Sequence, residues 1–222
     1  MNPPIPVNRM PVVIRNNGAV LQGELAVPAH ARGVVVFAQT VDHGRECPCN
    51  LHVATALHSA GLATFLFDLL APETPPSLGP EPAVDGMPLL AGRLVAVTRW
   101  ILADPTCGRL RLGYFGSHDG AAAALIAAAW LGAAVGAVVA RSGRPDLAEG
   151  AFRRVGSPVL FIVGERETEL LARNRSAVDQ MTSCPCQLAV VPGADSLIDR
   201  PGDIEQVAVF AREWFARHLA PT

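Results

Sequence analysis

The chain has 222 residues, 50% of them hydrophobic and 17% charged, with a formal net charge of −2. This length suits one large domain with a substantial core. The weak charge imbalance gives no basic footprint, so we do not expect nucleic acid as a partner. The N-terminus lacks a basic segment followed by an apolar one, so we expect a cytoplasmic protein rather than a secreted one. Five cysteines, an odd number, argue against a disulfide framework and predict reduced thiols.

Residues 1–10 are predicted to form a flexible, proline-rich lead to a single domain over 11–222. The domain opens with an antiparallel hairpin around Asn17-Gly18, a pair that favours a tight turn. The expected strands cover 12–15, 19–27, 33–38, 63–69, 109–115, 137–140, 159–163 and 187–191. The expected helices cover 51–60 (capped by Asn50 and stopped by Gly61), 89–103, a segment from Gly120, 169–181 and 201–219. This alternation indicates right-handed strand-helix-strand units, hence a mostly parallel sheet with helices on both faces.

The most apolar stretch, 121–140, is nearly long enough to cross a bilayer. Gly132 and Gly136 interrupt it. We therefore expect a helix, a turn and a buried strand, and no membrane partner.

The segment Gly116-Ser117-His118-Asp119-Gly120 has the form of a hydrolase nucleophile elbow, a strained turn between a strand and a helix. Only small residues fit two positions to either side of the apex, because the strand and helix backbones press together there. The two glycines of this segment meet that demand around His118. An apex at Ser117 would put the bulky Phe115 at one of those positions. The elbow is therefore predicted to present an imidazole where a nucleophile is usual.

Four segments carry a family resemblance: Gly113-Tyr114-Phe115-Gly116, 120–125, 142–147 and Val191-Pro192-Gly193-Ala194. They closely resemble small dienelactone-hydrolase-like members of the α/β-hydrolase family, and the resemblance extends over about 11–219. It implies the α/β-hydrolase fold, an eight-stranded, mostly parallel sheet with an antiparallel N-terminal hairpin. It also implies a triad of Ser, Asp and His, in that chain order, at the ends of three strands.

All three triad positions depart from the family pattern. The resemblance assigns His118 to the nucleophile position, Glu167 to the acid position and Ser196 to the histidine position. Serine and histidine have in effect exchanged places. We expect His118 to reach Ser196 while Glu167 orients the imidazole, as the carboxylate does in a conventional triad. Glu165 and Glu169 compete with Glu167 for the acid role.

The oxyanion hole is expected to use backbone N–H groups, one from Asp119 and the other from Gln39 or Thr40. Cys47 and Cys49, in the loop after the strand at 33–38, should border the same pocket. A thiol beside His118 could carry an acyl group, because a thiol needs less assistance from a base than a serine hydroxyl does.

These features predict acyl transfer from an ester or thioester to a thiol or amine, with His118 as the general base and acid. The expected substrate is a small acyl compound, and an acyl-carrier protein is a candidate partner. Neither Cys47-Pro48-Cys49 nor Cys184-Pro185-Cys186 has the spacing of a metal or redox motif. No metal or cofactor is therefore expected.

Three alternatives stay open. An ordinary ester or lactone hydrolase could use Ser117 as its nucleophile. A catalytically silent binding protein could keep His118 as a polar side chain that fills the former site. A cyclase or lyase could use the same histidine for proton transfer. Likewise, Glu167 could be only a solvated carboxylate at a helix start, and Ser196 only a turn residue.

Overall fold

The computed structural model describes residues 5–40, 44–70, 84–195, 198 and 200–220. Its strands are β1 (Val7–Asn16), β2 (Ala19–Pro28), β3 (Gly33–Gln39), β4 (Leu62–Asp68), β5 (Arg111–Ser117), β6 (Val135–Arg141), β7 (Val159–Gly164) and β8 (Cys186–Val191). Its α-helices are α1 (Pro48–Ser59), α2 (Met87–Ala103), α3 (Asp119–Leu131), α4 (Thr168–Gln180) and α5 (Pro201–His218). The 3-10 helices are η3 (Val84–Gly86), η4 (Gly132–Ala134) and η5 (Pro145–Arg154).

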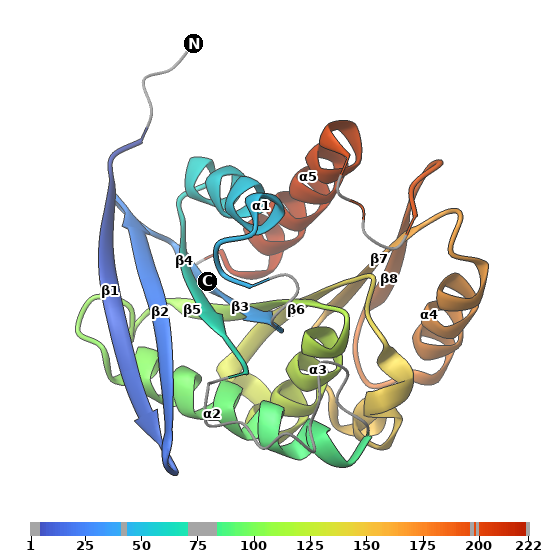
Figure 1. Ribbon diagram of the computed structural model, residues 1–222, viewed down its shortest axis with the longest axis horizontal. Helices are drawn as coiled ribbons and strands as arrows, with labels where there is room; N and C mark the ends of the chain where they lie inside the picture. Colours follow the sequence, from blue (N-terminus) through green and yellow to red (C-terminus); the bar gives the residue numbers. More distant parts are fainter. Residues whose placement is uncertain (1–4, 41–43, 71–83, 196–197, 199, 221–222) are drawn as a thin grey trace.

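All eight strands form one sheet in the order β1-β2-β4-β3-β5-β6-β7-β8 (Figure 1). The strands β1 and β2 pair antiparallel, and β2 also pairs antiparallel with β4. From β4 to β8 every neighbouring pair is parallel. This sheet is the predicted α/β-hydrolase architecture.

The N-terminal hairpin is longer than the sequence indicated. Its turn is as predicted, since Asn17 (φ 45°) and Gly18 (φ 83°) both adopt the left-handed conformation that a tight hairpin turn needs. However, β1 begins at Val7, so residues 7–10 belong to the sheet and the expected lead over 1–10 is wrong for them. The reason is that β1 lies at the edge of the sheet, where Pro11 costs no ladder hydrogen bond on the outer side.

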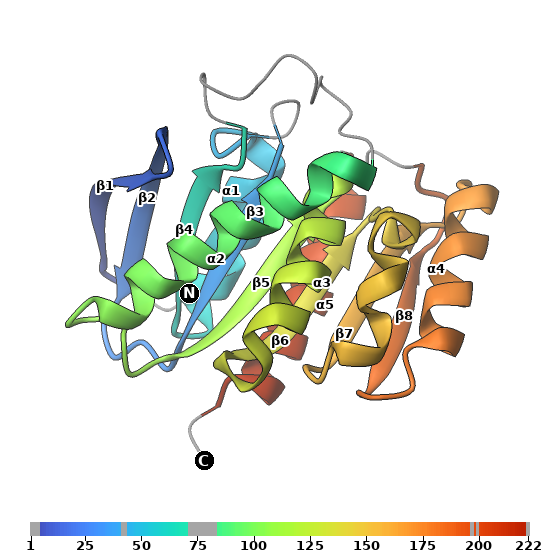
Figure 2. The ribbon, with the colours of Figure 1, turned by 90° about the horizontal axis from the view of Figure 1, so that it is seen from below.

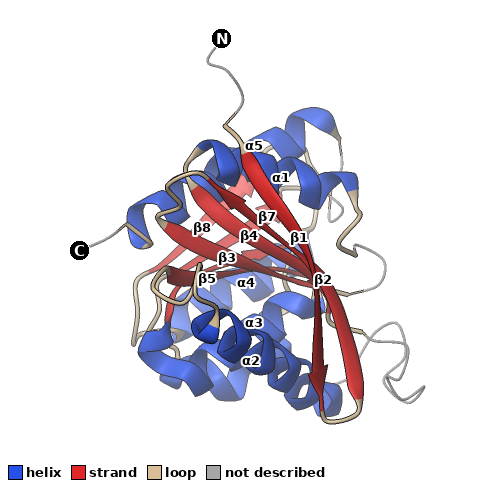
Figure 3. Cartoon of the chain, turned by 90° about the vertical axis from the view of Figure 1, so that its left-hand side faces the viewer, coloured by secondary structure: helices blue, strands red, loops and turns tan. Residues whose placement is uncertain are grey.

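Strands β3 to β7 are buried on both faces, and their side chains alternate between two apolar layers, whereas the edge strand β8 is mostly half-buried. In β3, Val34, Val36 and Ala38 pack with α2 and α3, whereas Val35 and Phe37 pack with α1 and α5. Figure 3 shows α1 and α5 on one side of the sheet and α2, α3 and α4 on the other, and Figure 2 shows the second group in front of the strands. This sandwich holds the C-terminal ends of the central strands in place.

The first helix departs from its predicted start. It begins at Pro48, with Cys47 as its N-cap residue, and Asn50 lies inside the helix. Proline suits the first helical position because the missing N–H would have no partner there. The Asn50 side chain is buried and donates to the Gly44 carbonyl at 3.2 Å rather than capping the helix. Gly61, with φ 71°, follows the helix end as predicted.

The apolar run at 121–140 forms most of α3, then η4 and most of β6, as the glycines in it predicted. Within the described ranges, no helix has both the length and the hydropathy needed to cross a membrane.

Candidate active site

His118 is the apex of a tight turn that joins β5 to α3. Its backbone has φ 50° and ψ −121°, a conformation that glycine normally supplies in turns. A Cβ on Gly116 would lie 2.6 Å from Ala121 Cα, and one on Gly120 would overlap the carbonyl oxygen of Ala38. The backbone of β5 is therefore in contact with α3 on one side of the turn, and the backbone of α3 is in contact with β3 on the other. The elbow thus has its apex at His118, as predicted.

Three backbone hydrogen bonds fix the apex. The His118 N–H donates to the Arg141 carbonyl at 3.2 Å, and the His118 carbonyl accepts from Ala121 at 3.2 Å and from Arg144 at 3.3 Å. The loop after β6 therefore helps to hold the elbow. His118 as a whole is half-buried, and the Nδ1 atom of its imidazole is buried.

Beneath the apex, the last residues of three neighbouring strands form a buried polar row: Gln39, Ser117 and Arg141. None of them is more than 1% exposed. The residues two positions earlier in each strand pack against α1 and α5, so strand alternation directs this row to the same side. Ser117 lies opposite Arg141 in the ladder and donates a hydrogen bond to Gln39 Oε1.

This row argues against Ser117 as a nucleophile. Its hydroxyl is buried and is used by Gln39, so a substrate could reach it only by breaking that contact. The other end of the same amide differs, because Gln39 Nε2 is buried without a hydrogen-bond partner among the described residues. A buried donor that lacks a partner costs about 1–3 kcal/mol, so the environment of Gln39 Nε2 calls for an explanation, such as an ordered water or a role in the site.

Ser142, the first residue of the family-like segment 142–147, was given no role in the site by the sequence, and it lies next to the row. It follows β6 with φ 45°, its N–H donates to the Ile162 carbonyl at 2.8 Å, and its side chain is 2% exposed. Its hydroxyl has no hydrogen-bond partner in the described part of the chain. The sequence could have indicated Ser142 as a site residue, because it is a polar residue directly after a buried strand. The C-terminal end of that strand lies beside the elbow.

The three candidate acids differ in their contacts. Glu165 accepts a hydrogen bond from the Gly193 N–H at 2.8 Å, and Glu169 pairs with Arg173 at 2.5 Å. Glu167 is the N-cap residue of α4 and is half-buried, and none of the described contacts involves its carboxylate. Glu167 is therefore the member of the three that is available for orienting an imidazole, and its catalytic role stays a prediction.

Ser196, the predicted partner of His118, lies outside the described residues. The segment that leads to it passes over the end of β7, because a Cβ on Gly164 would lie 2.6 Å from the Ala194 carbonyl oxygen and would overlap that of Asp195. The Arg166 N–H also donates to the Ala194 carbonyl at 2.9 Å. The loop after β8 and the loop that carries Glu167 are thus in direct contact.

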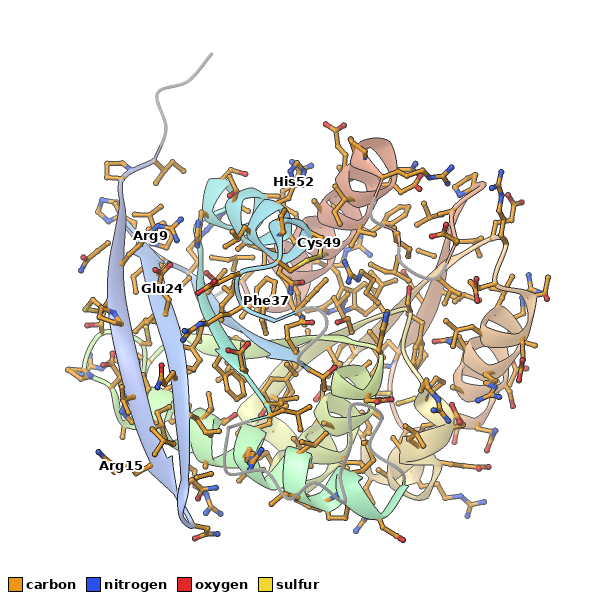
Figure 4. All side chains as sticks on the ribbon, viewed as in Figure 1. Arg9, Arg15, Glu24, Phe37, Cys49 and His52 are labelled. Atoms are coloured by element: carbon orange, nitrogen blue, oxygen red, sulfur yellow. A yellow bond between two sulfur atoms is a disulfide. The ribbon has the colours of Figure 1, made fainter. Side chains whose placement is uncertain are left out.

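The prediction of free thiols at Cys47 and Cys49 is wrong. The two residues form a disulfide, with their Cα atoms 5.4 Å apart, at the start of α1. Pro48, the first residue of the helix, lies between them. Figure 4 shows Cys49 at this helix start, with His52 further along the helix. Neither sulfur can carry an acyl group while the disulfide is intact.

The expected oxyanion donors lie at the same edge of the sheet. Asp119 opens α3, and the amides of a first helical turn point out of the helix toward a negative charge. Thr40 follows β3 and is buried. Their role in binding an oxyanion stays a prediction. In the segments that the structure covers, no three His, Cys, Asp or Glu side chains gather as a metal site would require.

A solved dienelactone hydrolase from Anabaena variabilis is 39% identical to this chain. The alignment covers 96% of this chain and 99% of that one, with a TM-score of 0.89. The chain belongs to the dienelactone hydrolase family. Its relatives in this family include hydrolases, and in this chain the residue at the elbow apex is His118.

Other similarities are broader or partial. Est1E from Butyrivibrio proteoclasticus has a TM-score of 0.78 at 14% identity, covering 94% of this chain and 98% of its own, and shares the fold. Two putative phosphoribosyl transferases of Mycobacterium tuberculosis are 46% identical over 197 residues, which is 89% of this chain. The chain spans 44% of the length of these relatives. No family model matches the chain.

Proposed function

We propose that this member of the dienelactone hydrolase family transfers an acyl group from an ester or thioester to an external thiol or amine. His118 takes the proton of the acceptor as the acceptor attacks the acyl carbon. The bond to the leaving group then breaks, and His118 returns the proton to the departing oxygen or sulfur. The observation that carries this proposal is the imidazole at the elbow apex, beside the N-terminus of α3.

The surroundings of His118 support an acceptor from outside the protein. The nearest hydroxyl in sequence, Ser117, is buried and bonded to Gln39, and the Cys47 and Cys49 sulfurs are joined to each other. A covalent acyl intermediate on these residues is therefore not part of the proposal. Direct attack by a bound acceptor needs only a base and an oxyanion hole.

Two buried groups support a polar acyl substrate. The donors at Gln39 Nε2 and Ser142 Oγ lack partners among the described residues and lie at the strand ends that flank the elbow. Both groups are closed to solvent in this structure, so a substrate would have to displace the covering side chains to reach them. A substrate carbonyl that then accepted from Gln39 Nε2 would satisfy a buried donor, and this would favour binding. A carrier-bound acyl group is one such substrate, and an acyl-carrier protein is its natural source.

The test is an acyl-transfer assay with N-acetylcysteamine thioesters and p-nitrophenyl esters, each with and without an amine acceptor. The His118→Asn variant should lose roughly 10²- to 10⁴-fold in turnover, the usual contribution of a general base. The matched control is His30→Asn, because His30 is an exposed histidine that also has a positive φ (57°). If His118→Asn turned over as fast as the wild-type protein, His118 would not be the base.

Hydrolysis is a second candidate, favoured by the 39% identity to a protein described as a dienelactone hydrolase. In this case the acceptor is water and the same histidine acts as the base. The assay separates the two, since transfer predicts acylated amine as the main product and hydrolysis predicts free acid at any amine concentration. Binding of the thioester with no turnover would instead favour a silent binding protein.

A further inference from the structure

The second Cys-Pro-Cys tripeptide lies far from the elbow in the fold. Cys184 and Pro185 precede β8, and Cys186 is its first residue. Because β8 runs parallel to β7, the tripeptide lies at the N-terminal ends of the parallel strands. The candidate active site lies at their C-terminal ends. None of the residues assigned to acyl transfer comes from the N-terminal ends.

The two thiols of this tripeptide face each other. Their Sγ atoms are 3.5 Å apart, within hydrogen-bond distance for sulfur, and both side chains are half-buried. The backbone is held to β7, because Cys186 pairs with Val159 and the Val159 N–H donates to the Pro185 carbonyl at 2.9 Å. The tripeptide therefore holds two neighbouring sulfurs, in half-buried residues, on a fixed support.

A tripeptide of the same sequence, Cys-Pro-Cys, contains a disulfide elsewhere in the chain. Cys47 and Cys49 are bonded to each other across Pro48. This spacing can therefore close into a disulfide in this protein. Cys184 and Cys186 have the same spacing but are free thiols, so the chain contains one tripeptide of this kind in each redox state.

The two thiols are not equivalent. The hydrogen bond from Cys186 lowers the pKa of Cys184, whereas the same bond, together with burial, raises the pKa of Cys186. A thiolate stabilised by a neighbouring thiol is the arrangement of an attacking cysteine beside a resolving one. Cys107 is a useful contrast, because it is fully buried and burial raises its pKa to about 11.

We propose that Cys184 and Cys186 form a thiol-disulfide exchange site that is reduced in this structure and accepts oxidation from an external disulfide. The Cys184 thiolate attacks one sulfur of the disulfide, and the other sulfur leaves as a thiolate. Cys186 then loses its proton to solvent and attacks the Cys184 sulfur, which releases the second thiolate. The external disulfide gains two electrons and the protein gains the bond between Cys184 and Cys186.

Oxidised glutathione is the probe for the test. The folded protein is treated with it at pH 7, quenched with acid, alkylated with iodoacetamide and mapped by mass spectrometry. The wild-type protein should form the disulfide within the peptide of Cys184 and Cys186, while Cys107 stays reduced. Cys186→Ser should accumulate glutathione on Cys184. Cys184→Ser should react at least about tenfold more slowly, because burial keeps the remaining thiol protonated.

Two results would overturn the proposal. One is full alkylation of Cys184 and Cys186 in the wild-type protein after treatment with oxidised glutathione, under conditions in which the same reagent modifies a free model thiol. The other is equal glutathione capture by the two serine variants, which would remove the distinction between attacking and resolving thiols. Circular dichroism of both variants checks their fold, and the order of modification in the wild-type protein tests the proposal if a variant does not fold.

Discussion

His118 and Gly132 flank α3 at its two ends and share one backbone conformation. The angles are φ 50° and ψ −121° at His118, and φ 54° and ψ −125° at Gly132. Glycine is the expected residue for this conformation, and a side chain there costs of order 1–3 kcal/mol. The molecule therefore uses the usual residue at one end of the helix and a strained one at the other, where the candidate site lies.

This comparison predicts that His118→Gly stabilises the fold by about 1 kcal/mol, since relief of strain outweighs the entropy that glycine adds to the unfolded chain. Acyl transfer should be lost in the same variant. Urea unfolding measures the first effect. Gly132→His is the reciprocal control and should destabilise by roughly 1–3 kcal/mol. No atom lies within 4 Å of the position that a Cβ would take there, so this loss would report the backbone alone. A destabilised His118→Gly protein would contradict the strain argument.

The close approach of strand and helix at the elbow predicts that Gly120→Ala destabilises by more than about 3 kcal/mol, because its Cβ would overlap the backbone of Ala38. Gly92→Ala is the matched control. Gly92 lies within α2, and a Cβ there would have no neighbouring atom within 4 Å, so alanine should stabilise by roughly 0.5–1 kcal/mol. Thermal unfolding of the two variants should therefore shift in opposite directions.

The contact between Ser117 and Gln39 predicts strong coupling in a double-mutant cycle. Ser117→Ala alone leaves both ends of the Gln39 amide buried without partners and should cost about 1–2 kcal/mol. Gln39→Met combined with Ser117→Ala removes every polar atom of the pair and should be at least as stable as the wild-type protein. If Gln39 Nε2 serves the substrate, the double variant should still raise KM. Additive stability changes would mean that the two side chains do not interact.

His58 predicts a loss of stability in acid. It is 4% exposed, its Nε2 lies 2.8 Å from Thr64 Oγ1, and burial, helped by Arg9, lowers its pKa to about 4. The unfolded chain then binds the proton below about pH 6.5 while the folded chain does not, so stability falls as the pH drops toward 4. The full effect is of order 3 kcal/mol. His58→Gln should flatten the pH dependence of urea unfolding between pH 6.5 and 4, and an unchanged slope would exclude this role.

Much of the architecture could be predicted because it depends on short patterns in the chain. Continuous apolar runs indicated the buried strands, and the two glycines around His118 indicated the register of the elbow. The start of β1 was missed because the density of prolines near the N-terminus suggested a loop. The strand in fact begins directly after Pro6 and accommodates Pro11 at the edge of the sheet. The start of α1 was missed because Pro48 defines it more strongly than Asn50 does.

The site was harder to predict because its contacts are not local in sequence. Gln39 and Ser117 are 78 residues apart, and their hydrogen bond depends on β3 and β5 being neighbours. The environment of the Ser142 hydroxyl depends on how β6 ends beside β7. The disulfide between Cys47 and Cys49 lies at the start of α1, and this start was predicted at residue 51 rather than at Pro48.

The edge strand β1 has a consequence for assembly. The outer side of this ten-residue strand has no neighbouring strand, and its free backbone groups would ordinarily allow another strand to extend the sheet. Here Pro11 removes one donor from that edge, and Arg9, which reaches Glu24 on β2 at 2.5 Å, adds an exposed charge (Figure 4). A second molecule could continue the sheet on this side only by pairing with an interrupted and charged ladder. Strand β1 therefore disfavours edge-to-edge pairing at this edge of the sheet.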